Sequence, residues 1–161
     1  EPETIHALSG SGRVNIGRND TLTVDGGTIA PGSSVGTLTI SGDTHDSSTE
    51  TFSVDAGTSF EFELGAVGSS DQLVFANHAA LTLDVGGHDL NIVDAGMQEG
   101  SYELMLFYDE TGALSDVNKP AEGLLNLNMP AGNMKGELDY SQTGKIILNA
   151  TTPKGTVIMI R

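Results

Sequence analysis

The sequence predicts an all-β protein and, within that class, a parallel β-solenoid with a less regular C-terminal strand region. Short runs that alternate apolar and polar residues recur along the chain, which is the period of a strand with one buried face. Glycine supplies 21 of the 161 residues and separates these runs, because it reaches positive φ at corners without steric cost. A β-sandwich or jelly roll whose hairpins share their turn chemistry stays the alternative fold.

The predicted strands follow one another at short intervals. No window of ten or more residues shows the 3.6-residue period of a helix. The alternating runs are residues 13–16, 21–24, 37–40, 51–54, 59–64, 81–85 and 89–93, followed by 102–108, 124–127, 145–148 and 156–160. The run 102–108 is nearly continuous in apolar groups, which predicts burial on both sides. Residues 109–123 have the weakest strand pattern, and we expect a loop or one short helical turn there.

Weak internal repetition favours the solenoid over the sandwich. A Val-Asp-x-Gly tetrapeptide begins at Val24, Val54 and Val93, at offsets of 30 and 39 residues, and Thr-Leu-Thr begins at Thr21 and Thr37. A turn motif at irregular intervals is typical of coils whose loops differ in length. Small and aliphatic side chains stack well inside such coils, which agrees with an aromatic content of only 5%.

A cluster of turn residues lies between two of the predicted strands. Proline fixes φ at Pro31 and Gly32 permits a tight corner, so the chain is expected to turn sharply at residues 30–32. Gly26, Gly27 and Gly36 complete this structural turn motif.

Residues 26–43 read Gly-Gly-Thr-Ile-Ala-Pro-Gly-Ser-Ser-Val-Gly-Thr-Leu-Thr-Ile-Ser-Gly-Asp. This segment resembles the autotransporter-associated β-strand repeat of bacterial passenger-type surface proteins. Residues 59–65 and the Ser-Asp-Gln-Leu-Val of 70–74 are similar to pieces that often follow that repeat, so the resemblance covers about residues 8–95. It implies a right-handed parallel β-helix, export to the cell surface and membership of a longer polypeptide. Residues 1–95 are then expected to form solenoid rungs, and residues 96–161 a C-terminal β region or cap on the same core.

The charge distribution is strongly uneven. The formal net charge is −15; residues 19–118 hold 17 acidic residues and no Lys or Arg, whereas residues 119–161 carry five basic and three acidic groups. This excludes nucleic acid as a partner, because phosphate binding needs clustered basic residues. The absence of cysteine excludes disulfides and thiolate metal sites. No stretch reaches the roughly 20 apolar residues of a membrane-spanning helix, so no membrane span is expected.

Candidate chemistry is sparse, and the sequence predicts no catalytic or cofactor-binding residue. Glu61 and Glu63 lie on the same side of one predicted strand, where a solvated face explains two carboxylates better than an acid–base pair does. The histidines have no metal-binding spacing. They are His6, His45, His78 and His88.

Calcium is the one metal for which the sequence offers candidates. Asp43 with Asp46, and Asp84 with Asp89, form the best local groups of carboxylates in turns, and carboxylate oxygens are calcium ligands. Neither group has the spacing of an EF-hand loop.

The last apolar segment consists of Val157, Ile158, Met159 and Ile160. It is either the last strand of its own domain or a strand for assembly with a neighbouring subunit. The predicted function is a secreted or cell-surface, non-enzymatic bacterial module, as a rigid stalk, adhesin segment or assembly subunit. Its expected partners are itself, neighbouring domains of a longer chain or a surface glycan. The alternatives are a glycan- or cation-binding surface module and a polysaccharide-degrading β-helix enzyme.

Overall fold

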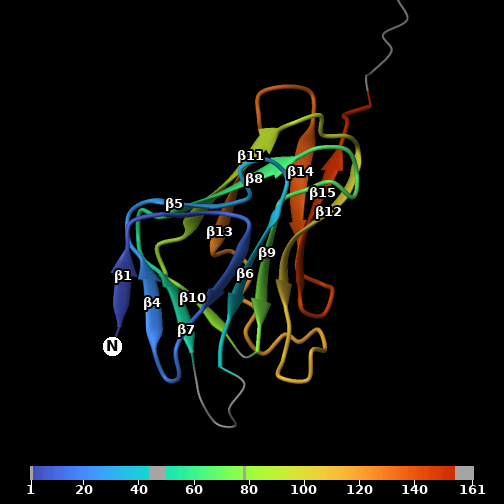
Figure 1. The fold of residues 1–161 in the computed structure, drawn as a ribbon. Helices are drawn as coiled ribbons and strands as arrows, with labels where there is room; N and C mark the ends of the chain where they lie inside the picture. Colours follow the sequence, from blue (N-terminus) through green and yellow to red (C-terminus); the bar gives the residue numbers. More distant parts are fainter. Residues whose placement is uncertain (1, 44–49, 78, 155–161) are drawn as a thin grey trace, which may run out of the picture.

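The computed structural model describes residues 2–43, 50–77 and 79–154, and this part of the chain consists of strands and turns (Figure 1). Its strands form three sheets of four, five and six strands. The all-β prediction is therefore confirmed. Among the described residues there is no helix with the length and apolarity that a bilayer crossing requires.

The chain visits the three sheets in a fixed order. Sheet A has the strand order β1-β4-β7-β10, sheet B β13-β11-β8-β5-β2, and sheet C β14-β15-β12-β9-β6-β3. The strands are β1 (Glu3–Ile5), β2 (Leu8–Gly10), β3 (Gly12–Asn15), β4 (Thr21–Val24), β5 (Thr28–Pro31), β6 (Thr37–Ser41), β7 (Thr51–Val54), β8 (Ser59–Leu64), β9 (Gln72–Ala76), β10 (Ala80–Leu83), β11 (His88–Asp94), β12 (Gly100–Phe107), β13 (Leu125–Asn128), β14 (Lys135–Asp139) and β15 (Lys145–Thr151). Every third strand returns to the same sheet and pairs in parallel with its predecessor, so β1–β12 make four solenoid-like coils.

The register of the strands explains the irregular repeats in the sequence. Val24 pairs with Val54, so the first two copies of the tetrapeptide occupy equivalent positions one coil apart. The third copy is not equivalent, because Val93 pairs with Glu63 in sheet B. Leu83 takes the equivalent place in the fourth coil, next to Val54. The coils differ in length because the connections between sheets differ, as residues 32–36 between β5 and β6 and residues 65–71 between β8 and β9 illustrate.

The C-terminal part ends the parallel stack. β13 still pairs in parallel with β11, but β15 runs antiparallel to β12 and β14 antiparallel to β15. The fourth coil itself extends to Phe107, beyond residue 95. Ile146, Leu148 and Ala150 of β15 belong to the same hydrophobic core as the coils.

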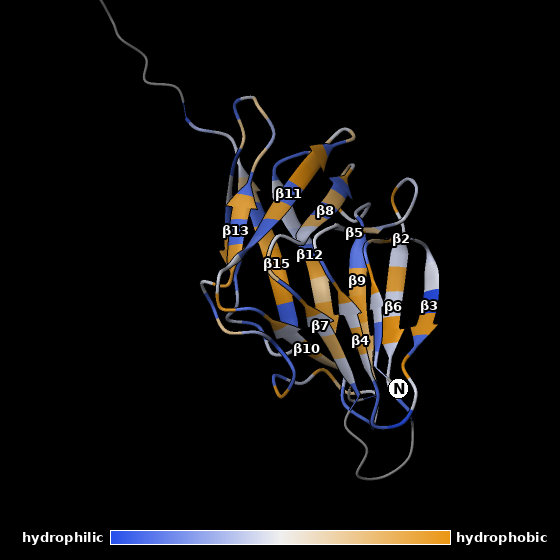
Figure 2. Cartoon of the chain, turned by 90° about the vertical axis from the view of Figure 1, so that its left-hand side faces the viewer, coloured by the Kyte–Doolittle hydropathy of each residue, from blue (hydrophilic) through white to orange (hydrophobic). Residues whose placement is uncertain are grey.

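The core lies inside the coils, where alternate residues of strands such as β4, β7 and β8 are buried. Figure 2 shows how hydrophobic and hydrophilic residues are distributed along the strands. Burial on the inner face and polarity on the outer face are what the alternating sequence predicts. The stretch from Leu104 to Phe107 is buried throughout, which confirms the prediction for this run. A register shift between Glu103 and Met105 makes two neighbouring residues, Leu104 and Met105, both inaccessible.

The turn predicted at residues 30–32 begins later than expected, where β5 ends. β5 continues through Pro31, which pairs with Gly10, and the corner follows at Gly32 with a φ of 84°. Proline fits there because the pairing of β5 with β8 stops at Ile29, so the missing N–H interrupts no ladder on that side. β1, β2, β5, β9 and β14 are strands that the sequence pattern does not predict, and residues 109–123 are a loop without a helix. The predicted strand 156–160 lies outside the described residues.

Candidate functional site

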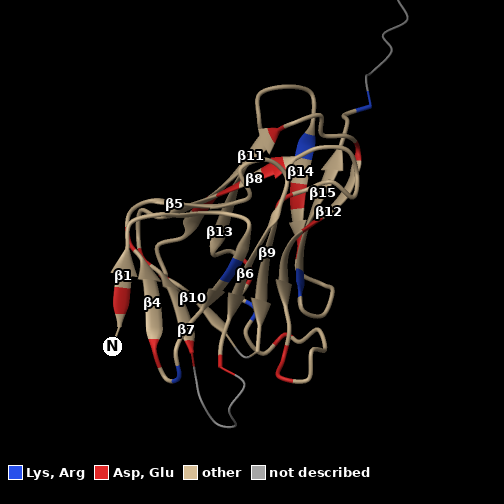
Figure 3. Cartoon of the chain, in the orientation of Figure 1, with Lys and Arg blue, Asp and Glu red and all other residues tan. Residues whose placement is uncertain are grey.

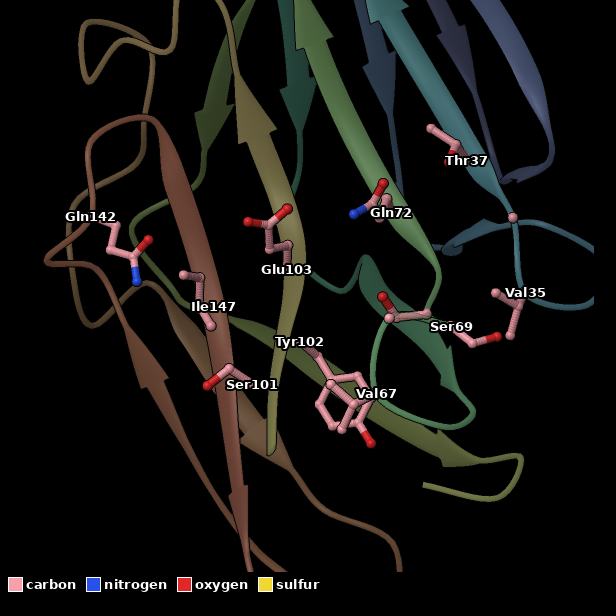
Figure 4. A pocket seen from close by; sticks show the side chains of 13 residues that line it. Val35, Thr37, Val67, Ser69, Gln72, Ser101, Tyr102, Glu103, Gln142 and Ile147 are labelled. Carbon is pink, nitrogen blue, oxygen red and sulfur yellow. The ribbon is translucent and has the colours of Figure 1, made fainter. Parts of the chain in front are cut away.

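A hollow with a volume of about 540 Å³ lies over the outer face of sheet C (Figure 4). Gln72 of β9 and Glu103 of β12 extend from neighbouring strands on this face. Val67 and Ser69 form one rim, and Ile147 of β15 lies in the lining on the other side.

The rim of the hollow is held by a compact turn at residues 65–70. Gly65 N donates to Ser69 O at 2.8 Å, and the hydroxyl of Tyr102 lies 3.1 Å from Gly65 O and 2.8 Å from Gln98 O, so it can donate to either. The same hydroxyl accepts a hydrogen bond from Gln98 N at 2.8 Å. Tyr102 is buried, so its ring anchors the rim from inside rather than offering a stacking surface.

Asp71 bridges two coils directly behind this rim. Its Oδ1 accepts from Gly36 N and its Oδ2 from Glu63 N, both at 2.8 Å, and its side chain is almost fully buried. Burial raises the pKa of Asp71 above its ordinary value, against the opposing effect of the two backbone donors. The carboxylate thus joins the start of β6 to β8 and fixes the rim's position.

Replacing Asp71 with asparagine should lower the free energy of unfolding by about 1–3 kcal/mol, because the amide accepts from one backbone N–H and turns its own NH₂ toward the other. Urea denaturation at neutral pH measures this loss.

The stability contributed by Asp71 also depends on pH. Since the folded state raises the pKa of Asp71, the folded protein holds the proton of this carboxyl group more tightly than the unfolded chain does. The wild type therefore gains stability from this group as the pH falls through the folded pKa, and the difference from Asp71→Asn should widen. Equal urea midpoints at neutral pH would contradict the bridge.

The side chains around the hollow are suited to hydrogen bonding with neutral polar groups. Glu103 is already paired with Lys145, at 2.5 Å, and Ser101 donates to Asn149 at 2.6 Å. These contacts fix the polar groups and reduce the free charge of the hollow. The phenylalanine rings lie elsewhere, since all five are buried in the core.

The predicted turn residues have two different roles in the structure. Gly26 and Gly32 have φ values of 73° and 84°, in the left-handed region that favours glycine. Gly27 and Gly36 are instead required for close approach, since a Cβ there would lie 1.7 Å from His6 O and 2.2 Å from Ser11 Oγ, respectively.

The calcium candidates are dispersed. Asp84 caps its own turn by accepting from Val85 N at 2.7 Å, and Asp89 is exposed on β11. Asp43 lies beside a separate hollow that Arg13 also lines, and Asp46 is outside the described residues. Within the described ranges, His, Asp and Glu side chains do not gather in threes around a possible metal position.

Glu61 and Glu63 lie on the outer side of β8, as their alternation with the buried Phe60 and Phe62 shows. His6 is exposed, with Nδ1 2.8 Å from Asp25 O, whereas His88 is buried with Nδ1 3.0 Å from Thr58 O. These groups do not share a site.

Two lysines of the C-terminal region make ion pairs, one with a strand of the coils and one within its own loop; Figure 3 shows how the charged residues are distributed over the fold. Lys145 pairs with Glu103, and Lys119 pairs with Asp116 at 2.5 Å. Lys119 also donates to Tyr140 O and Gln142 O, so it ties the loop before β13 to the turn between β14 and β15. The hydrogen bond from Lys119 and that from Gly144 N lower the pKa of Asp116. The candidate assembly residues 157–160 lie outside the described part of the chain.

No family model matches the chain, and no curated protein matches it. The resemblance to the autotransporter-associated repeat therefore stays a prediction. The sequence pattern also did not single out Glu50, Asp71 or Tyr102 as structural anchors, although all three are buried polar residues or contact buried backbone.

Proposed function

We propose that this chain is a non-enzymatic structural module of a secreted or cell-surface bacterial protein, built as a right-handed β-helix of the autotransporter-associated type. The observation that carries the proposal is the in-register stacking of four coils around one continuous core. Such a stack is stiff along its axis, because each coil is hydrogen-bonded to its neighbours through three sheets. Stiffness is the property that a stalk or an adhesin segment requires.

The C-terminal region acts in this proposal as a cap. Antiparallel β14 and β15 end the parallel ladder of sheet C, and the pair Lys145–Glu103 attaches β15 to the coils. The hydrogen bonds of Lys119 to Tyr140 O and Gln142 O attach the loop before β13 to the turn between β14 and β15. Terminal units that differ from the repeats are typical of solenoids, whose end coils otherwise present open strand edges. The exposed Lys135 and Lys154 remain available for contact with the acidic body of a neighbouring molecule.

Size-exclusion chromatography with light scattering, together with negative-stain micrographs, tests the end-to-end association. The full chain should form multimers at low ionic strength that dissociate as salt is added, because the contact joins opposite charges. A chain ending at Pro153 should associate less, since it lacks Lys154 and the predicted assembly strand. Monomers of both chains under all conditions would refute self-association, and release of sugar fragments from polysaccharides would refute the non-enzymatic assignment.

A further inference from the structure

Around the hollow over sheet C, three polar side chains of the described residues make no hydrogen bond to the protein. They are those of Thr37 in β6, Ser69 in the rim and Gln72 in β9. Thr37 pairs with Gln72 in register, and Glu103 extends from the next strand of the same face (Figure 4). The floor of the hollow is therefore a row of hydroxyl, amide and carboxylate groups that can exchange hydrogen bonds with a ligand.

Apolar groups stand beside this polar floor. Val35 and Val67 line the hollow on the side of the rim, and Val67 is 52% exposed. A saccharide has the same division of character, because its hydroxyl groups project from the edge of the ring while C–H groups cover the faces. The volume of about 540 Å³ lies within the range of about 300–1,000 Å³ that is typical of small-molecule sites.

Both sides of the hollow are held in place from the core. The buried hydroxyl of Tyr102 lies 3.1 Å from Gly65 O, at the start of the turn that carries Ser69. Asp71 accepts from Gly36 N at 2.8 Å, directly before Thr37. A site whose walls are already ordered loses less conformational entropy when a ligand binds, so even a few weak contacts suffice for binding.

Charge limits the kind of ligand that this floor accepts. Lys145 donates to Oε1 of Glu103, which neutralises the carboxylate and leaves Oε2 as an acceptor. Residues 19–118 contain no Lys or Arg, so an acidic ligand would face the negative body of the protein without a cation of that region to pair with. A neutral ligand avoids this cost.

The strand arrangement argues against a peptide in the same place. An extended peptide binds a sheet through the free backbone groups of an edge strand. β6, β9, β12 and β15 all lie between two neighbours in sheet C, so the floor of the hollow is a sheet face whose backbone is already paired. Recognition here depends on side chains, which is how hydroxyl-rich ligands are bound.

We propose that this hollow binds a short neutral oligosaccharide. Thr37, Gln72 and Glu103 hydrogen-bond to its hydroxyl groups, and Val67 contacts the C–H face of one ring. The inference goes beyond the structural role proposed above and does not depend on self-association, because the site lies on the side of the stack. A hollow that is open to solvent binds weakly, with a Kd on the order of 1 mM.

Nuclear magnetic resonance titration of the full, ¹⁵N-labelled chain tests the site through the side-chain amide of Gln72. The neutral probes are cellotriose, maltotriose and triacetylchitotriose, and trigalacturonic acid is the acidic counterpart. At least one neutral probe should shift the Gln72 amide together with the backbone amides of residues 67–70. The acidic probe should bind at least about tenfold more weakly, because the body repels it.

Gln72→Leu removes the amide from the floor at nearly constant size, and its position on the half-buried outer face of β9 leaves the core intact. It should weaken binding about tenfold, as expected for the loss of hydrogen bonds to the ligand. Gln98→Leu makes the same change at an exposed position outside the hollow and should bind like the wild type.

The unchanged amide spectrum of each variant outside the hollow verifies that it folds. The proposal is overturned if none of the three neutral probes shifts the Gln72 amide, or if Gln72→Leu and Gln98→Leu bind equally well. Equal binding of trigalacturonic acid would overturn the preference for a neutral ligand. None of these results would affect the multimers that test the structural role, so the two proposals fail separately.

Discussion

Replacing Phe75 with alanine should lower the free energy of unfolding by about 3–5 kcal/mol. Phe75 is fully buried in β9, and its ring is stacked on Phe107 of the next coil, with centroids 4.9 Å apart and planes at 3°. It also contacts Phe52 of sheet A, at 6.0 Å and 54°. The truncation removes both aromatic contacts and leaves a cavity in the middle of the stack, where neighbouring strands in register restrict any collapse.

Urea denaturation followed by far-ultraviolet circular dichroism measures this loss in a chain without tryptophan. Val85→Ala is the matched control, because Val85 is 90% exposed and its truncation should change stability by less than about 0.5 kcal/mol. If the two variants had the same urea midpoint, the stacked rings would not support the core.

The strands that the sequence predicts with correct bounds are those with one buried and one solvated face. β4, β7 and β8 are found at 21–24, 51–54 and 59–64, as expected, because their alternation has a direct physical cause in burial. β1 and β2 have only three residues each, too few for a period to be visible. β14 is an edge strand without a fully buried residue, so its sequence carries little hydrophobic pattern.

β9 is not among the strands predicted from the sequence, although the alternation typical of a strand is present in its residues. Leu73 and Phe75 are buried and alternate with Gln72 and Val74, which are not. The short run follows a serine-rich turn, and in the sequence it stands out only as part of the family resemblance.

The anchors around the candidate sites were beyond sequence reasoning for a different reason. Asp71 binds Gly36 N, 35 residues away, and Glu50 binds Asn19 N, 31 residues away. Each separation is about one coil, so these contacts exist only once the register of the coils is known. An isolated aspartate or glutamate in a turn looks like any solvated charge, and the sequence therefore does not distinguish a buried bridge from a surface group.

Register also explains why two similar glycine pairs in the sequence carry very different constraints. Gly26-Gly27 precedes β5, where the backbone of the first coil runs alongside, and Ser59 N donates to Gly27 O at 2.9 Å. Gly86-Gly87 precedes β11 in the fourth coil. A Cβ on Gly86 would have no atom within 4 Å, and its φ lies outside the left-handed region. Glycine is thus required at position 27 and replaceable at position 86, whereas Gly87 keeps a φ of 79° that favours glycine.

Gly27→Ala should therefore destabilise the protein by about 3 kcal/mol, at the upper end of the cost of overpacking. Its methyl group would lie 1.7 Å from the carbonyl oxygen and 2.7 Å from the carbonyl carbon of His6, and backbone atoms move less readily than a flexible side chain. The first coil must shift away from the second, so hydrogen exchange should accelerate in β1 and β2 before it does in β8.

Gly86→Ala is the control for this substitution, because it makes the same chemical change in open space. It should leave the urea midpoint unchanged or raise it slightly, since alanine reduces the conformational freedom of the unfolded chain. Equal midpoints for the two variants would show that the first coil does not pack against Gly27 as described. A selective loss of protection in β1 and β2 of Gly27→Ala, with the later coils intact, would instead show that close backbone approach at this corner holds the first coil to the stack.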